Sequence, residues 1–150
     1  MATQYTQSAD GTKIAYDVTG HGPPLVLLHG AGKTRKDWHT TGYVQRLRAD
    51  FTVIAVDIRG SGESGYSEKS ADYAIDTLRQ DLDAVADACQ APQFAIWGYS
   101  LGGNIARYAG SGSDRVTAMA VVGIPFGPAV DERFDRFIDR FAEKYALPGG

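Results

Sequence analysis

The sequence predicts an α/β domain with a mostly parallel, doubly wound sheet and an N-terminal antiparallel hairpin. Short apolar runs of strand length alternate with helical patterns between residues 25 and 122, which is the pattern of a parallel sheet with helices on both faces. With 150 residues, 43% of them hydrophobic, the chain is long enough for one domain with a real core. His29, Asp57 and Gly98 each follow an apolar run, at the strand ends where such sheets place their sites.

The elements are expected in the following order. Ile14, Tyr16 and Val18 alternate after the Asp10-Gly11 turn and predict a hairpin with the segment near Tyr5. The buried strands are predicted at Leu25–Leu28, Val53–Val56, Phe94–Trp97 and Met119–Val122. Helices are predicted around 36–49, 76–89 and 101–110, and the apolar face of the second comprises Ile75, Leu78, Leu82, Val85 and Cys89.

The segment Gly98-Tyr99-Ser100-Leu101-Gly102 carries the clearest chemistry. It lies between a predicted strand and a predicted helix, the context of a nucleophile elbow, in which a strained turn exposes the serine hydroxyl. The glycines at 98 and 102 are expected because strand and helix pass too close to the turn for a Cβ, and Gly103 relieves the same crowding. We expect Tyr99, the variable position, to point away from substrate and to pack in the core.

Oxyanion donors are predicted on two segments. The N–H of Leu101, which follows the serine, is one donor in the elbow geometry. The strand Leu25–Leu28 enters the loop His29-Gly30-Ala31-Gly32, from which we expect the N–H of Ala31 as the second.

These motifs make the chain resemble the N-terminal portion of the α/β-hydrolase superfamily. The resemblance spans residues 5 to 125 and rests on four motifs in order. They are His29-Gly30-Ala31-Gly32 with Trp38 after it, Asp57-Ile58-Arg59-Gly60-Ser61-Gly62-Glu63-Ser64, the elbow, and Asp114-Arg115-Val116 before another apolar strand.

The resemblance implies a serine hydrolase with Ser100 as nucleophile, acting on an ester or related acyl bond without a metal or organic cofactor. The family's order is serine, then an acid, then histidine. Here the three histidines, His21, His29 and His39, all precede Ser100. The base and acid are therefore expected beyond residue 150, with the C-terminal strands and helices of the fold, and the isolated chain is expected to be at best feebly active. Asp131, the first acid after the last predicted strand, lies at a position that some members of the family use for the acid, but it also begins a charged helical segment.

Other functions remain open. A non-catalytic half-fold that serves as a binding or assembly module would keep the same motifs. Perhydrolases and carbon–carbon bond hydrolases keep the serine as well, whereas the serine argues against relatives that use an aspartate there.

Two nucleotide-binding motifs are incomplete. Gly32-Lys33-Thr34 has Leu27 where a P-loop requires its first glycine. Gly60-Ser61-Gly62-Glu63-Ser64-Gly65 matches a dinucleotide-binding pattern, but no apolar helical periodicity follows it.

Several single residues have plain structural explanations. Asp57 and Arg59 are expected to brace their loop, and Lys33, Arg35 and Lys36 to form a solvated helix start. Trp38 is expected either to line the acyl pocket or to cover the sheet. His29, Gly30, Gly98, Tyr99 and Gly102 are assigned to substrate binding or loop support.

The composition and charge of the chain limit the classes of partner that we expect. The formal charge of −3 gives no case for nucleic acid, and no apolar stretch approaches the roughly 20 residues of a membrane span. The start Met1-Ala2-Thr3-Gln4 does not resemble a signal peptide, so the expected compartment is the cytoplasm. The single cysteine, Cys89, is expected to be a small buried hydrophobe.

The C-terminal segment is expected to begin a second region. Residues 1–128 form the predicted hydrolase core, and 129–150 the start of a cap or lid. Asp131 to Tyr145 has the pattern of an amphipathic helix, which fits either a cap helix or an ordinary helix packed on the sheet. The strand 119–122 is expected to be an exposed sheet edge that invites self-association.

Overall fold

The computed structural model describes residues 2–123. Their strands are β1 (Gln4–Gln7), β2 (Lys13–Gly20), β3 (Pro24–Leu28), β4 (Thr52–Val56), β5 (Phe94–Tyr99) and β6 (Val116–Val122). Their α-helices are α1 (Lys36–Thr40), α2 (Tyr43–Leu47), α3 (Ile75–Ala88) and α4 (Leu101–Gly110), and a short 3₁₀-helix, η1, spans Ser70–Tyr73. None of the helices in this part of the chain has the length and apolarity to cross a membrane.

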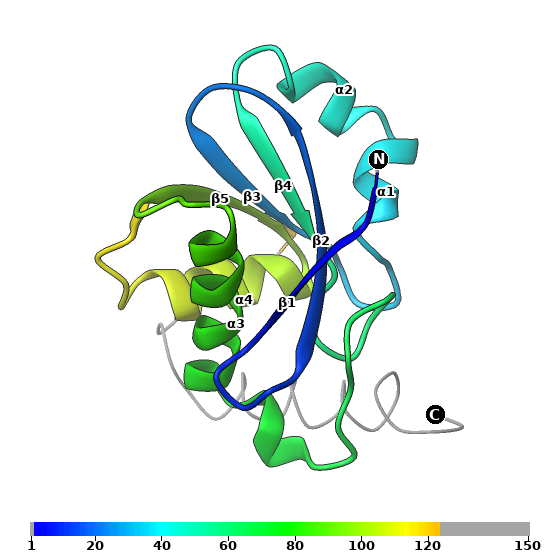
Figure 1. Ribbon diagram of the computed structural model, residues 1–150, viewed down its shortest axis with the longest axis vertical. Helices are drawn as coiled ribbons and strands as arrows, with labels where there is room; N and C mark the ends of the chain where they lie inside the picture. The colour runs from blue at the N-terminus through cyan, green and yellow to red at the C-terminus, as the bar shows by residue number, and fades with distance from the viewer. Residues whose placement is uncertain (1, 124–150) are drawn as a thin grey trace.

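The strands form one mixed sheet in the order β1-β2-β4-β3-β5-β6 (Figure 1). Strands β4, β3, β5 and β6 are parallel neighbours, and β2 runs antiparallel to both β1 and β4. The predicted fold class, a mostly parallel sheet with an N-terminal antiparallel hairpin, is confirmed.

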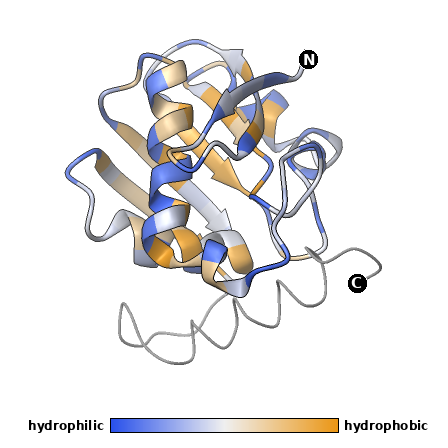
Figure 2. Ribbon diagram, turned by 60° about the horizontal axis from the view of Figure 1, so that its bottom comes forward, coloured by the Kyte–Doolittle hydropathy of each residue, from blue (hydrophilic) through white to orange (hydrophobic). Residues whose placement is uncertain are grey.

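The sheet separates two apolar layers because successive side chains of a strand point to opposite faces. Val26 and Leu28 of β3 pack with α3 and α4 in the larger layer, whereas Leu25 and Leu27 pack with α1 and α2 in the smaller one. Figure 2 shows the central strands in the colours of hydrophobic residues. Each fully buried Leu or Val side chain contributes roughly 2 kcal/mol, so the central strands hold the domain together.

The predicted face of α3 is confirmed. Leu78, Leu82 and Val85 are buried, and Ile75 and Cys89 pack at the border of the same layer. The helix predicted at 36–49 is instead two short helices, α1 and α2. Gly42 separates them with a φ of +86°, a backbone conformation that glycine adopts without strain.

The carboxyl ends of β3, β4 and β5 meet at one edge of the sheet, as their parallel pairing requires. His29, Asp57 and Ser100 follow these three strands. The loops are tied together, since the N–H of Arg35 donates to Asp57 (2.8 Å) and the N–H of Gly102 donates to the carbonyl of His29 (3.0 Å). This edge is the expected position for a site.

Among residues 2–123, β6 is an edge strand and pairs with β5 alone. Its Met119 and Val122 side chains are 39% and 45% exposed. The expected boundary after residue 128, Asp131 and the expected helix up to Tyr145 lie outside the described residues.

Candidate active site

Ser100 occupies a sharp turn between β5 and α4. Its φ of 53° and ψ of −111° are rare for a residue with a side chain. Its N–H donates to the Val122 carbonyl (2.8 Å), and its own carbonyl accepts from the N–H of Asn104 (3.0 Å). The turn is thus held from β6 on one side and from α4 on the other, and the serine itself is half-buried.

The two glycines of the elbow have no room for a side chain. A Cβ on Gly98 would lie 2.2 Å from the carbonyl oxygen of Gly102, and one on Gly102 would lie 2.1 Å from that of Leu28. Gly103 is less confined, with its nearest atom, the Gly98 carbonyl oxygen, at 3.2 Å. The structure therefore explains this glycine pattern by close backbone packing, as predicted.

The two candidate oxyanion donors lie on neighbouring loops. Within residues 2–123, no hydrogen bond uses the N–H of Leu101 or that of Ala31. Gly30, which precedes Ala31, lies against the elbow: a Cβ built on it would be 3.6 Å from the Cβ of Ser100. Leu101 is fully buried and Ala31 half-buried.

The His29 side chain contacts the loop that carries Ala31. The side chain is buried, and its Nδ1 lies 2.8 Å from the Gly30 carbonyl oxygen. The N–H of Ile58 donates to Nε2 (3.1 Å), so Nε2 carries no proton and Nδ1 is the donor to Gly30. Burial lowers the pKa of this imidazole, which keeps the ring neutral. His29 thus supports the loop, one of the two roles expected for it.

A cavity of about 320 Å³ opens beside the elbow. It is lined by His29, Gly30, Lys33, Asp37, Trp38, Thr41, Tyr43, Trp97, Tyr99 and Val122. The expectation that Tyr99 packs in the core is wrong, because this side chain is 49% exposed and forms part of the cavity wall. Strand alternation explains its direction: Phe94 and Ile96 face the larger apolar layer, so Trp97 and Tyr99 face the other way.

Three aromatic rings that contact one another form part of the cavity wall. Tyr43 makes edge-to-face contacts with Trp38 and with Trp97, each at 5.4 Å between ring centroids. Trp38 is 7% exposed and joins the smaller apolar layer, so it both covers the sheet and lines the cavity. Sequence reasoning missed Tyr43 and Trp97, although the alternation along β5 could have placed Trp97 on this face.

Arg35 is buried, which corrects its assignment to a solvated basic cluster. Only 2% of its side chain is exposed, and its guanidinium contacts Asp57 (2.5 Å), Asp17 (3.0 Å) and Glu63 (3.2 Å). Asp57 also accepts from the N–H of Glu63 (2.9 Å). The Tyr5 hydroxyl and Arg35 hold the pKa of Glu63 well below its usual range, at about 2. This charged cluster fixes the loops after β3 and β4.

Arg59 braces the second loop with other partners. Its guanidinium binds Asp81 (2.6 Å) and Asp10 (2.8 Å), and the bond from Arg59 holds the pKa of Asp10 far below its ordinary value. Asp57 and Arg59 therefore both brace their loop, as expected, although they do so through separate ion pairs. Gly62 lets this loop close on Asp57, since a Cβ there would lie 2.3 Å from Oδ2.

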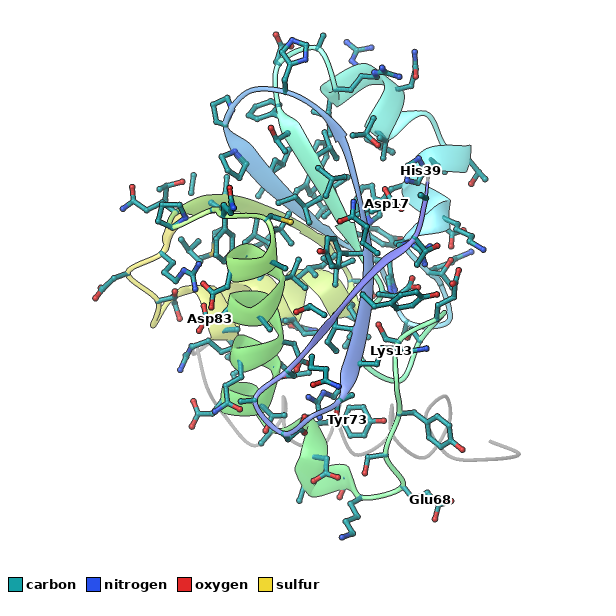
Figure 3. All side chains as sticks on the ribbon, in the orientation of Figure 1. Lys13, Asp17, His39, Glu68, Tyr73 and Asp83 are labelled. Atoms are coloured by element: carbon teal, nitrogen blue, oxygen red, sulfur yellow. The ribbon has the colours of Figure 1, made fainter. Side chains whose placement is uncertain are left out.

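The other two histidines lie away from the elbow. His39 of α1 and Asp17 of β2 point toward one another (Figure 3), with Nε2 and Oδ1 2.8 Å apart, and neither residue lines the cavity. His21 is exposed in the turn before β3, at the opposite ends of the strands. Within residues 2–123, no group of three or more His, Cys, Asp or Glu could hold a metal ion.

A mixed sheet of this order, with a serine in a strained strand-to-helix turn at its carboxyl edge, defines the α/β-hydrolase class of proteins. The sequence agrees with this assignment. Residues 23–149 match the family model described as alpha/beta hydrolase fold, so the chain belongs to the α/β-hydrolase family.

Individual relatives include named enzymes. A pimeloyl-[acyl-carrier protein] methyl ester esterase of Vibrio atlanticus is 39% identical over 98 residues, which are 63% of this chain and 33% of that protein. An esterase from a Rhodococcus species shares 35% identity and a TM-score of 0.72, covering 81% of this chain and 46% of the other. The structure of a bottromycin epimerase in complex with bottromycin A2 shares 31% identity and a TM-score of 0.73, over 79% and 47%.

The chain spans less than half the length of each of these relatives. The chain thus belongs to the α/β-hydrolase family and has relatives named as esterases, whereas its activity and substrate are matters for proposal.

Proposed function

We propose that this chain carries the nucleophile and the oxyanion hole of a serine hydrolase that cleaves an ester or a related acyl bond of a small molecule. The observation that carries the proposal is the backbone of Ser100, a non-glycine residue held at positive φ between two glycines that cannot accept a Cβ. Such strain persists where the surrounding structure enforces it, and it clusters at reacting groups.

In the proposed reaction, Oγ of Ser100 attacks the acyl carbonyl carbon, and the carbonyl oxygen takes up the negative charge. The N–H groups of Leu101 and Ala31 stabilise that charge; each such donor is worth roughly a hundredfold to a thousandfold in rate. The alcohol leaves with a proton, and water then attacks the acyl-enzyme, which releases the acid and restores the serine.

A general base completes the mechanism. No histidine follows Ser100 in the 150 residues, and the His39–Asp17 pair does not line the cavity. We infer that the histidine and its orienting acid are supplied from outside this sequence. Without them, the oxyanion hole and substrate binding leave only a residual rate.

The test is covalent labelling with a fluorophosphonate, detected by mass spectrometry of the modified peptide. We expect labelling at Ser100 that Ser100→Ala abolishes and that Ser111→Ala, a change at an exposed serine after α4, leaves intact. Labelling should accelerate when a C-terminal segment carrying Asp and His is added. No labelling even in that longer protein would refute the proposal.

The bottromycin epimerase among the structural relatives shows that this fold also carries a protein named for a different reaction. It favours, as a second candidate, a non-hydrolytic function of the same fold. Retention of ligand binding in Ser100→Ala, together with absent labelling in the wild type, would select this second candidate.

We also propose that β6, which pairs with β5 alone among residues 2–123, pairs along its other edge with a second copy of the chain. The strand Val116–Val122 carries no charged side chain, so antiparallel pairing about a two-fold axis brings no like charges together. Sedimentation velocity should show a dimer that Ala120→Lys dissociates, whereas a monomer at all concentrations would contradict the pairing.

A further inference from the structure

The imidazole of His29 occupies an unusual position, since it contacts the peptide that precedes a candidate oxyanion donor. The inference below rests on the proposed function, because it concerns how that donor is aimed. The Gly30 carbonyl accepts two hydrogen bonds, one from Nδ1 of His29 (2.8 Å) and one from the N–H of Lys33 (3.2 Å). The direction of this carbonyl is therefore fixed.

The Gly30 carbonyl and the Ala31 N–H belong to the same planar peptide unit. In a trans peptide the two groups point in opposite directions, and the described chain contains no cis peptide bond. Fixing the carbonyl against the His29 ring consequently fixes the N–H of Ala31 on the other side. That N–H makes no hydrogen bond within residues 2–123, so it is free to serve a ligand.

The ring itself is held by the neighbouring loop. The N–H of Ile58 donates to Nε2 (3.1 Å), and the ring is buried with 2% exposure. The backbone of the same residue reaches the elbow, because the His29 carbonyl accepts from the N–H of Gly102 (3.0 Å), next to Leu101. One residue thus links both candidate oxyanion donors.

We propose that His29 is a positioning residue for the oxyanion hole: its Nδ1–H holds the Gly30 carbonyl and thereby aims the Ala31 N–H at the oxygen of the reacting acyl group. The ring transfers no proton, because both of its nitrogens are engaged by the protein, with the Gly30 carbonyl and the Ile58 N–H. It acts as a neutral donor whose tautomer is set by Ile58.

Three substitutions separate the two ring contacts. The amide of Asn reaches the position of Nδ1, so His29→Asn keeps a donor for Gly30 and loses the acceptor for Ile58. His29→Gln reaches the position of Nε2 and keeps only the Ile58 contact, and His29→Leu removes both. We expect the rate of fluorophosphonate labelling at Ser100 to fall about 100-fold in the Gln and Leu variants, the effect of losing one oxyanion donor, and less than about 10-fold in the Asn variant.

A purely structural role makes a different prediction. It would lower the labelling rate in all three variants in proportion to their loss of thermal stability, or leave the rate unchanged in all that fold. Either pattern, or a Gln variant faster than the Asn variant, would overturn the proposal. In the longer protein with its base, the change should appear in kcat, with KM unaltered.

A second readout needs no reaction and works on the unmodified chain. The ¹⁵N shifts of the His29 ring should show a protonated Nδ1 and a bare Nε2 at neutral pH, and the Ala31 amide signal should move in the Gln and Leu variants but stay in place in the Asn variant. A bare Nδ1 would overturn the inference. If Ser100 is not labelled at all while these signals behave as expected, the proposed function fails and the positioning contact stands.

Discussion

The elbow at Ser100 and the two loops beside it, 29–35 and 57–65, are held in place by different forces. The elbow depends on backbone packing, because a Cβ on Gly98 or Gly102 would meet main-chain carbonyl oxygens. The loops depend on buried charge, with Arg35 bridging Asp17, Asp57 and Glu63. The candidate oxyanion donors are Leu101 in the elbow and Ala31 in the loop 29–35.

The difference teaches where each region is vulnerable. Close backbone packing is indifferent to pH and salt but excludes even one methyl group. A buried ionic cluster accepts changes of shape more easily, but it fails when one partner is removed and the others remain charged in a dry environment. The proposed oxyanion hole therefore joins a rigid donor, Leu101 in the elbow, with a donor on a loop held by buried charge, Ala31.

The largest expected effect tests the charged loops. Arg35→Met should lower the free energy of unfolding by about 3–5 kcal/mol, because Asp57 and Asp17 would stay buried without their cation. Urea denaturation followed by circular dichroism measures this difference. Lys36→Met is the control, since Lys36 is 66% exposed and should cost less than about 1 kcal/mol. Equal effects of the two changes would contradict the claim that the buried ion pairs of Arg35 stabilise the loops.

The next effect tests the elbow. Gly102→Ala should destabilise the chain by about 3 kcal/mol, because the added Cβ would lie 2.1 Å from the Leu28 carbonyl oxygen and neither main chain can move freely. Gly112→Ala is the matched control: its Cβ meets only the flexible end of the Arg79 side chain. A Gly102 variant as stable as the Gly112 variant would show that the elbow is not closely packed.

These two regions also differ in how far the sequence predicts them. The elbow was predictable because glycine spacing reports directly on missing Cβ space, and strand-then-helix patterns surround it. Burial of Arg35 was not predictable, since its partners lie 18 and 22 positions away in the sequence, at Asp17 and Asp57, and meet only in the folded sheet. A short run of Lys and Arg, taken without its distant partners, predicts an exposed segment.

The pH dependence of the free energy of unfolding tests the loop 29–35 through His29, with a smaller expected effect. Burial lowers the folded-state pKa of His29 below the unfolded value of 6.5, so the unfolded chain binds more protons as the pH falls below about 6.5. The contribution of His29 to stability is fully present above that pH and is lost as the pH decreases toward its folded pKa. The loss cannot exceed about 1.4 kcal/mol per pH unit, the value for one proton.

Urea denaturation at several pH values between 7.5 and 5 measures this loss. His29→Asn should have a shallower pH dependence than the wild type, whereas Ser100→Ala should keep the wild-type slope. Identical slopes in the wild type and His29→Asn would mean that the buried ring does not resist protonation.

The smallest effect concerns the variable position of the elbow. Tyr99→Leu should change the free energy of unfolding by less than about 1 kcal/mol, because the side chain is 49% exposed and only partly packed. The same denaturation assay applies, and a loss above about 2 kcal/mol would restore the core assignment. Ligand binding in the cavity, in contrast, should respond to this substitution, since Tyr99 forms part of its wall.

The remaining differences from the sequence-based expectations are local. Tyr99 faces the cavity because the alternation of side chains along β5 continues through Gly98 to Tyr99. The prediction instead treated Tyr99 as part of the turn. The division of the 36–49 helix at Gly42 reflects a positive φ that the pattern of apolar residues did not register. Both cases concern local backbone geometry, whereas the fold class, a mostly parallel sheet with an N-terminal hairpin, followed from the longer patterns.

The positive φ of Ser100 has a consequence for any attempt to engineer this protein. A residue with a Cβ stores conformational strain of about 1–3 kcal/mol in such a region, and glycine would relieve it. Random libraries screened for heat resistance alone would therefore enrich replacements that delete the hydroxyl. Selection must therefore include a test of reactivity, or it will replace the proposed nucleophile by a residue with a more relaxed main chain.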